Sequence, residues 1–135
     1  MHNSARSQMA AALVNRRCGD KLIAESAGLA PGKLNPLVVQ ALEEDGIDIS
    51  QNQTRSVEDV FRAGTVFDYI VTVCSEAESE GCPVFPGRGE RLHWPFDDPS
   101  QFTGSEAERL AQTRLVREQI RAHVAQFCDS LGERA

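Results

Sequence analysis

The stretch MHNSARSQMA (residues 1–10) decides how the rest of this chain is interpreted. A polar segment leads here into apolar residues at helical spacing, namely Met9, Ala10, Leu13 and Val14. The N-terminus of such a helix directs backbone N–H groups and partial positive charge at one point, which favours an oxyanion. Arg6 adds a planar guanidinium that matches a tetrahedral anion such as phosphate. On these residues alone a frayed chain end is the commoner interpretation, so the prediction depends on the rest of the sequence.

Composition limits the function classes. The chain has 135 residues, enough for one domain with a buried core, and 41% hydrophobic and 25% charged residues are ordinary for a globular protein. A net charge of −6 argues against a nucleic-acid binder, although a local loop can still bind a small anion. We find no apolar run of the roughly 20 residues needed for a membrane span and no secretory leader, and expect a cytoplasmic protein that does not bind membranes. Its four cysteines are then expected to be reduced thiols, and without a Cys-x-x-Cys pair they predict no metal site.

The apolar pattern predicts strands that alternate with helices, and therefore a three-layer α/β domain. Strands are expected at residues 22–27, 69–74 and 91–94, with a short extended piece at 47–50. Helices are expected at residues 7–17, from Pro36 until Gly46 ends the second helix, at 57–62, and from about 105 to 131. Asn35 before Pro36 is typical of a helix start, and Ser105 with Glu108 forms a capping-box pattern. The last helix carries one apolar face, made by Val116, Ile120, Val124, Phe127 and Leu131.

The segment YIVTVC (residues 69–74) is the clearest strand in the chain. It is rich in β-branched residues and almost continuously apolar, as is typical of a parallel strand that is buried on both faces. Functional sites of doubly wound sheets lie just beyond the carboxyl ends of such strands. Cys74 stands at that end, which makes it a candidate site residue.

Several short motifs occur in the order found in one known family. They are HNSARSQMA (2–10), SAG (26–28), NP (35–36), GIDIS (46–50), FDYIVTVC (67–74), CPVFPG (82–87), HW (93–94) and DDP (97–99). The chain resembles, over nearly its whole length, the thioredoxin-coupled arsenate reductases that have the low-molecular-weight protein tyrosine phosphatase fold. The resemblance implies a parallel four-stranded sheet flanked by helices, and an enzyme of arsenic detoxification.

The chain departs from the family at its N-terminus. The family loop reads Cys, five residues, then Arg, and counting back from Arg6 places the cysteine immediately before Met1. The first strand, which the family places centrally in the sheet, is missing too. We therefore expect residues 1–135 to be a single domain truncated by a misassigned start, with little or no catalysis of its own. The sheet then either lacks its first central strand or takes it from a second copy of the chain, in a strand-swapped homodimer.

The resemblance also implies roles for individual residues. The anion loop corresponds to Asn3, Ser4, Ala5, Arg6 and Ser7, and the catalytic residues to Arg6, Cys74, Cys82 and Asp98. The loop cysteine attacks arsenate, Cys74 attacks the resulting adduct and releases arsenite, and Cys82 then forms a disulfide with Cys74. Thioredoxin reduces that disulfide, and Asp98 is the general acid. No cofactor is implied, and since Ala11 stands where relatives often carry Glu, we predict no bound cation.

Other interpretations of these residues remain open on the sequence alone. Cys74 and Cys82 can be two unrelated thiols, and Asp97-Asp98-Pro99 can be a simple turn in which Asp97 is easily confused with Asp98. Cys18 and Cys128 are interpreted as a structural or incidental thiol and a packed thiol. The whole chain can alternatively be a low-molecular-weight protein tyrosine phosphatase, or a non-catalytic oxyanion-binding protein.

Overall fold

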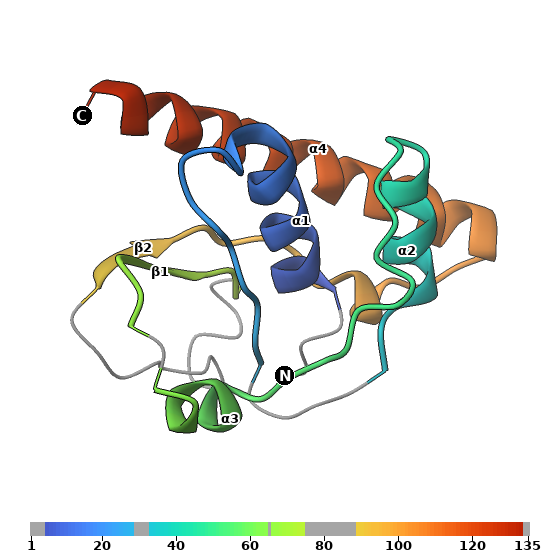
Figure 1. Cartoon of the computed structure of the whole chain (residues 1–135). Coiled ribbons are helices and arrows are strands. Elements are labelled where there is room, and N and C mark those ends of the chain that lie inside the picture. The colour runs from blue at the N-terminus through green and yellow to red at the C-terminus, as the bar shows by residue number, and fades with distance from the viewer. Residues whose placement is uncertain (1–4, 29–32, 65, 75–88, 134–135) are drawn as a thin grey trace.

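The computed structural model describes residues 5–28, 33–64, 66–74 and 89–133. The elements follow in the order α1 (Arg6–Cys18), α2 (Pro36–Glu43), α3 (Val57–Arg62), β1 (Tyr69–Thr72), β2 (Glu90–His93), the short 3-10 helix η2 (Pro99–Gln101) and α4 (Glu106–Glu133). Helix α4 runs along one side of the molecule with α1 packed against it, and α3 lies on the opposite side (Figure 1). No helix in these ranges is long and apolar enough to cross a membrane.

The two strands form a parallel pair. Tyr69 lies opposite Glu90 and Thr72 opposite His93, and the backbone pairing continues to Trp94, whose N–H donates to Thr72 O at 2.8 Å. The strands predicted at 69–74 and 91–94 are therefore confirmed to within two residues. The sheet has two strands in the described part of the chain, where the family resemblance predicted four.

Our prediction of a strand at residues 22–27 is wrong. This segment forms no ladder, and only the next residue, Gly28, makes an isolated parallel bridge, to Ser56. A hollow of about 700 Å³ lies between the segment and β1, so their backbone groups do not pair. The side-chain amide of Asn15 bonds the backbone of Ala24 instead, accepting from its N–H at 2.8 Å and donating to its carbonyl at 3.0 Å. An extended backbone without a neighbouring strand needs such substitutes.

The helices begin where the local sequence predicts. Helix α2 starts at Pro36, and the Asn35 side chain caps it by accepting from Leu37 N at 2.9 Å. At the start of α4, Ser105 Oγ accepts from Glu108 N at 3.1 Å and Glu108 Oε1 accepts from Ser105 N at 3.4 Å, which is the predicted capping box. Helices α1 and α3 match their predicted ranges to within one residue.

The core lies between α1 and α4. The predicted apolar face of α4 is confirmed, since Val116, Ile120 and Val124 are all buried. They pack in one cluster with the apolar stripe of α1, with Val38 and Leu42 of α2, and with Trp94 and Phe96 beyond β2. The described core is therefore formed mainly by the packing of α4 against α1 and α2 and against the segment after β2.

Our expectation that Cys18 and Cys128 are thiols is also wrong. The two residues form a disulfide, with their Cα atoms 5.9 Å apart and 110 residues of sequence between them. Helices α1 and α4 pack side by side, so the last residue of α1 lies against the last turns of α4. Sequence spacing gives no hint of a contact that depends on how two distant helices pack.

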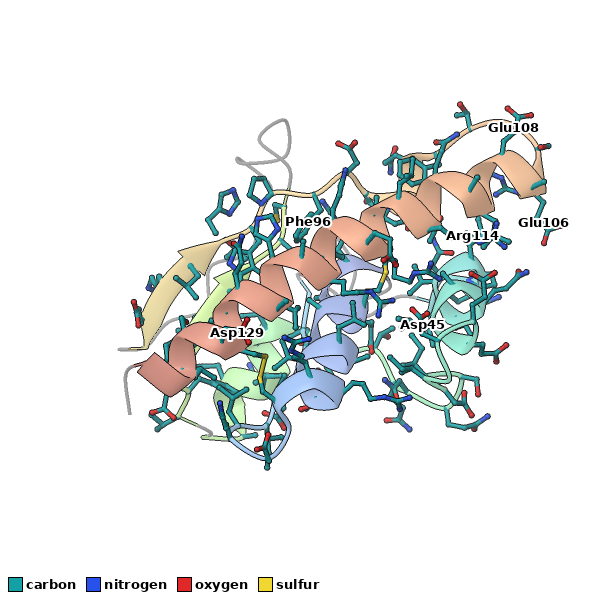
Figure 2. All side chains as sticks on the ribbon, turned by 90° about the horizontal axis from the view of Figure 1, so that it is seen from above. Asp45, Phe96, Glu106, Glu108, Arg114 and Asp129 are labelled. Carbon is teal, nitrogen blue, oxygen red and sulfur yellow. A yellow bond between two sulfur atoms is a disulfide. The ribbon has the colours of Figure 1, made fainter. Side chains whose placement is uncertain are left out.

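Ion pairs join α2 to α4. Arg114 and Arg117 of α4 bond the carboxylate of Glu44, with the shortest distances 2.5 Å and 2.9 Å, and Arg117 also donates to Ala41 O at 2.7 Å. Hydrogen bonds from Arg114, then those from Arg117, lower the pKa of Glu44 from 4.5 to about 2. Asp45, the next residue, pairs with both Arg117 and Arg121, and Figure 2 shows Arg114 on α4 where that helix passes α2.

Replacing Glu44 with Gln should lower the thermal unfolding midpoint at neutral pH. Because the pKa of Glu44 is lower in the folded state, its stabilising effect is complete above about pH 4.5 and is lost as the pH falls toward 2. The difference in midpoint between wild type and E44Q should therefore shrink over that interval, as measured by circular dichroism. The neighbouring E43Q substitution is the control, and an equal effect of E43Q at every pH would contradict the prediction.

Candidate active site

Arg6 joins three segments that are distant in sequence. It is the first residue of α1, and its side chain is only 7% exposed. Its Nη1 donates to Phe96 O at 2.9 Å and to Val73 O at 3.3 Å, and its Nη2 lies 3.5 Å from Asp98 Oδ2. A buried guanidinium is stable only when its donors find acceptors, and these contacts provide them. They hold the start of α1, the end of β1 and the loop after β2 together.

The carboxylate of Asp98 is held from two sides. Its Oδ2 faces Arg6, while its Oδ1 accepts from Ser100 N at 2.9 Å and caps the short helix η2. The Asp98 side chain is 17% exposed, whereas Asp97 is exposed. The structure therefore distinguishes the two aspartates that the sequence left as candidates for the general acid. Asp98 is the one that faces Arg6.

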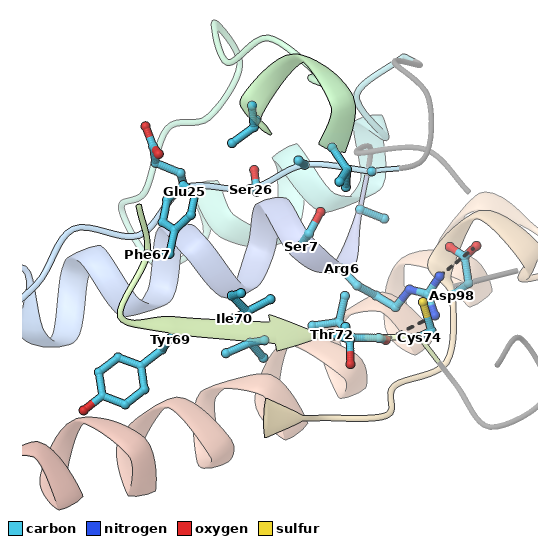
Figure 3. A pocket seen from close by; sticks show the side chains of 17 residues that line it. Arg6, Ser7, Glu25, Ser26, Phe67, Tyr69, Ile70, Thr72, Cys74 and Asp98 are labelled. Carbon is cyan, nitrogen blue, oxygen red and sulfur yellow. Dashed lines mark hydrogen bonds and ion pairs between the residues drawn. The ribbon is translucent and has the colours of Figure 1, made fainter. Parts of the chain in front are cut away.

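A cavity of about 150 Å³ opens beside Arg6. Figure 3 shows Arg6, Cys74 and Asp98 grouped at one end of it, with Ser7 and Ser26 further along. Ala5 and Ser7 also line the cavity, so the N-terminal end of α1 borders it directly. The positive end of the helix dipole and the Arg6 guanidinium both favour a small anion in this position.

Cys74 lies two residues beyond β1 and lines the same cavity. It is 4% exposed and disulfide-bonded in this structure. The other half of the predicted relay, Cys82, lies outside the described residues, as do Asn3 and Ser4 of the predicted anion loop. The structure thus brings together Arg6, Cys74 and Asp98, and with them Ala5 and Ser7.

Some features of this region were not predicted. The carbonyl acceptors of Val73 and Phe96 give no sequence signal, because every residue carries a carbonyl. Gln8, which is 3% exposed, donates to Gln53 O at 3.2 Å and accepts from Asn52 Nδ2 at 3.1 Å. These bonds attach the 50–54 loop to the first turn of α1. Within the described ranges, no group of three or more His, Cys, Asp or Glu residues is placed to hold a metal ion.

Comparisons with known proteins agree with this geometry. The family model of low molecular weight phosphotyrosine protein phosphatases matches residues 1–135. An arsenate reductase of Bacillus subtilis is 39% identical over 128 residues, which cover 95% of this chain and 90% of that protein. The crystal structure of an arsenate reductase from Archaeoglobus fulgidus is similar with a TM-score of 0.68 and 31% identity, covering 93% of this chain and 94% of that one.

A thioredoxin-dependent arsenate reductase from Corynebacterium glutamicum is similar as well. Its structure gives a TM-score of 0.70 at 28% identity and covers all of this chain and 60% of that one. The arsenate reductases and the family model thus point to the same group of enzymes. The chain belongs to the low molecular weight phosphotyrosine protein phosphatase family, and within it to the arsenate reductases.

Proposed function

We propose that the domain reduces arsenate to arsenite through a relay of cysteine thiols, and that thioredoxin restores the thiols. The observation that carries this proposal is the position of Cys74. It is disulfide-bonded and lines the same cavity as Arg6 and Asp98, which supports a thiol–disulfide step beside the position proposed for the oxyanion. A phosphatase needs the arginine and the aspartate but not this sulfur.

Arg6 and the N-terminus of α1 bind the oxyanion in this proposal. The guanidinium lies 3.5 Å from the Asp98 carboxylate, so it already pairs with one negative group at the edge of the cavity. Asp98, held by its bond to Ser100 N, is then placed to protonate the oxygen that leaves when a thiolate attacks arsenic. Ala5 and Ser7 line the wall of the cavity next to Arg6, and Asn3 and Ser4 belong to the same proposed anion loop.

The redox steps balance as two-electron exchanges. A loop thiolate displaces an oxygen from As(V), which leaves as water, and the Cys74 thiolate then attacks the loop sulfur. The sulfur–arsenic bond breaks, its electron pair stays on arsenic to give arsenite, and a loop cysteine–Cys74 disulfide remains. Cys82 attacks Cys74 and displaces the loop thiolate. Thioredoxin supplies two electrons to reduce the Cys74–Cys82 disulfide.

The relay needs a nucleophile that the 135 residues do not include, and the proposal places it immediately before Met1. The hollow between β1 and residues 22–27 supports this view. It is about 700 Å³ in volume, it is bordered by α1 and by both extended segments, and Leu22, Ala24, Val71 and Val73 give it apolar walls. One further strand would fill it and pair with the open edge of β1. Without that strand and its cysteine, we expect little or no turnover.

Arsenate-dependent oxidation of NADPH, coupled through thioredoxin and thioredoxin reductase, tests the proposal. The 135-residue chain should show background rates, and a chain extended upstream by a strand and a cysteine should turn over. The same extended chain with Ser in place of that cysteine is the matched control. Absence of turnover in a folded extended chain would count against the reductase and in favour of an oxyanion-binding protein.

The two thiols of the relay separate the reductase from a phosphatase. In the extended chain, C74S and C82S should each abolish arsenate turnover while hydrolysis of p-nitrophenyl phosphate continues, because phosphate-ester hydrolysis uses only the loop cysteine, Arg6 and Asp98. Ser130 lies in the last turns of α4, where its hydroxyl donates to Phe127 O, and S130A is a control that should change neither rate. Full arsenate turnover in C74S would remove Cys74 from the mechanism.

Arg6 should matter for stability as well as for anion binding. In R6A the carbonyls of Phe96 and Val73 lose a buried donor, and we expect the free energy of unfolding to fall by about 1–3 kcal/mol. R6K keeps the charge but loses the planar fork, so it should recover only part of the stability and bind inorganic phosphate weakly. Urea unfolding and calorimetric titration with phosphate measure the two effects.

The control for Arg6 is R62A on α3. Arg62 is 73% exposed and pairs with Glu58 across one helical turn, so its loss should change stability by no more than about 0.5 kcal/mol. Equal urea midpoints for R6A and R62A would show that the buried contacts of Arg6 do not stabilise the fold.

A further inference from the structure

Cys18 and Cys128 form a buried bond at the far end of α1. Cys18 is the last residue of α1, Cys128 lies in the last turns of α4, and each is only 3% exposed. Figure 2 shows the yellow sulfur–sulfur bond near Asp129, where α4 crosses the end of α1. The arsenate reductase relay proposed above has no use for this pair of sulfurs.

The packing of the two helices brings the sulfurs together. Leu13 and Val14 of α1 lie in the same buried cluster as Ile120 and Val124 of α4, one or two turns before the cysteines. The 5.9 Å between the two Cα atoms is in the range that a disulfide requires. The cysteines are therefore held at bonding distance by apolar contacts that do not depend on the bond itself.

This pair is separate from the site around Arg6. Arg6 is the first residue of α1 and Cys18 the last, and a helix of 13 residues rises by about 18 Å between them. Cys74 lines the cavity at the Arg6 end. A thiol at Cys18 cannot reach Cys74 without unfolding α1, so the two disulfides exchange electrons independently.

We propose that Cys18 and Cys128 are a second redox site, which exchanges with dithiols and stabilises the domain when it is oxidised. A dithiol reductant attacks one sulfur, the Sγ–Sγ bond breaks, and the reductant leaves as a disulfide, having supplied two electrons and two protons. A small-molecule disulfide such as oxidised glutathione accepts the same electrons when the bond reforms. The oxidised form closes a loop of 110 residues and restricts the unfolded chain.

Burial determines how this site reacts. An attacking thiolate must approach a sulfur along the line of the bond, and both sulfurs belong to residues that are 97% covered. Exchange therefore needs the ends of α1 and α4 to separate. Just outside the disulfide, Arg17 and Asp129 form an ion pair of 3.3 Å between side chains that are 53% and 69% exposed. An exposed pair of this kind contributes little, so this ion pair alone does not hold the two helix ends together.

Thermal unfolding of the C74S/C82S variant tests the proposal, because that variant retains only the Cys18–Cys128 pair. After equilibration with oxidised glutathione, peptide mapping should find Cys18 and Cys128 linked. Dithiothreitol should then lower the unfolding midpoint by about 10 °C. Failure to form the link, or a midpoint that is the same with and without dithiothreitol, would overturn the proposal.

Two further variants test whether the shift in the unfolding midpoint comes from the Cys18–Cys128 disulfide. D129A in the C74S/C82S background removes the neighbouring ion pair and should keep the dithiothreitol-dependent shift. C18A/C128A in the same background should unfold near the midpoint of the reduced protein and be insensitive to dithiothreitol. The comparison of oxidised with reduced C74S/C82S protein leaves Cys18 and Cys128 in place, so it stands even if C18A/C128A fails to fold. A shift that persists in a folded C18A/C128A variant would place the redox effect elsewhere and overturn the proposal.

Discussion

The buried guanidinium of Arg6 is the contact on which the candidate site depends. A charged group that is 7% exposed must have its donors accepted, and the acceptors come from the end of β1 and from the loop after β2. Meeting this need brings Cys74 and Asp98 to the positive end of α1. The hydrogen bonds and ion pair of Arg6 therefore place the positive end of α1, the sulfur of Cys74 and the carboxylate of Asp98 around one cavity.

Helix α1 is held at both ends and along its length. Arg6 anchors its first turn, the disulfide from Cys18 anchors its last, and α4 packs along the length between them. Helix α4 in turn is tied to α2 through Glu44 and its arginines. The two described strands pair over only four residues, so helix packing adds to the Arg6 contacts in positioning the N-terminal end of α1.

Sequence reasoning succeeded where the signal is local. Asn35 before Pro36 and Ser105 with Glu108 identify helix starts because a cap bonds its own first turn. Val116, Ile120 and Val124 identify a buried face because helical spacing is intrinsic to the chain. The motifs around Arg6, Cys74 and Asp98 led to a cavity that these three residues do share.

Sequence reasoning failed where the local structure depends on a residue far away in the sequence. Residues 22–27 have strand composition, but a ladder requires a neighbouring strand and a hollow lies there instead. The Cys18–Cys128 bond and the carbonyls that accept from Arg6 were missed for the same reason.

Asp98 shows how a short motif encodes the direction of a functional group. Proline disfavours helical backbone in the residue before it, so Pro99 keeps Asp98 extended at φ −85° and ψ 113° while η2 begins beyond it. An aspartate at that position caps the helix with one oxygen, Oδ1, which bonds Ser100 N. The capping bond fixes the side chain and leaves Oδ2 directed at Arg6. The Asp-Pro pair thus determines both that a short helix starts here and that one carboxylate oxygen faces the cavity. Asp97 is one residue earlier and exposed, so it cannot take the place of Asp98.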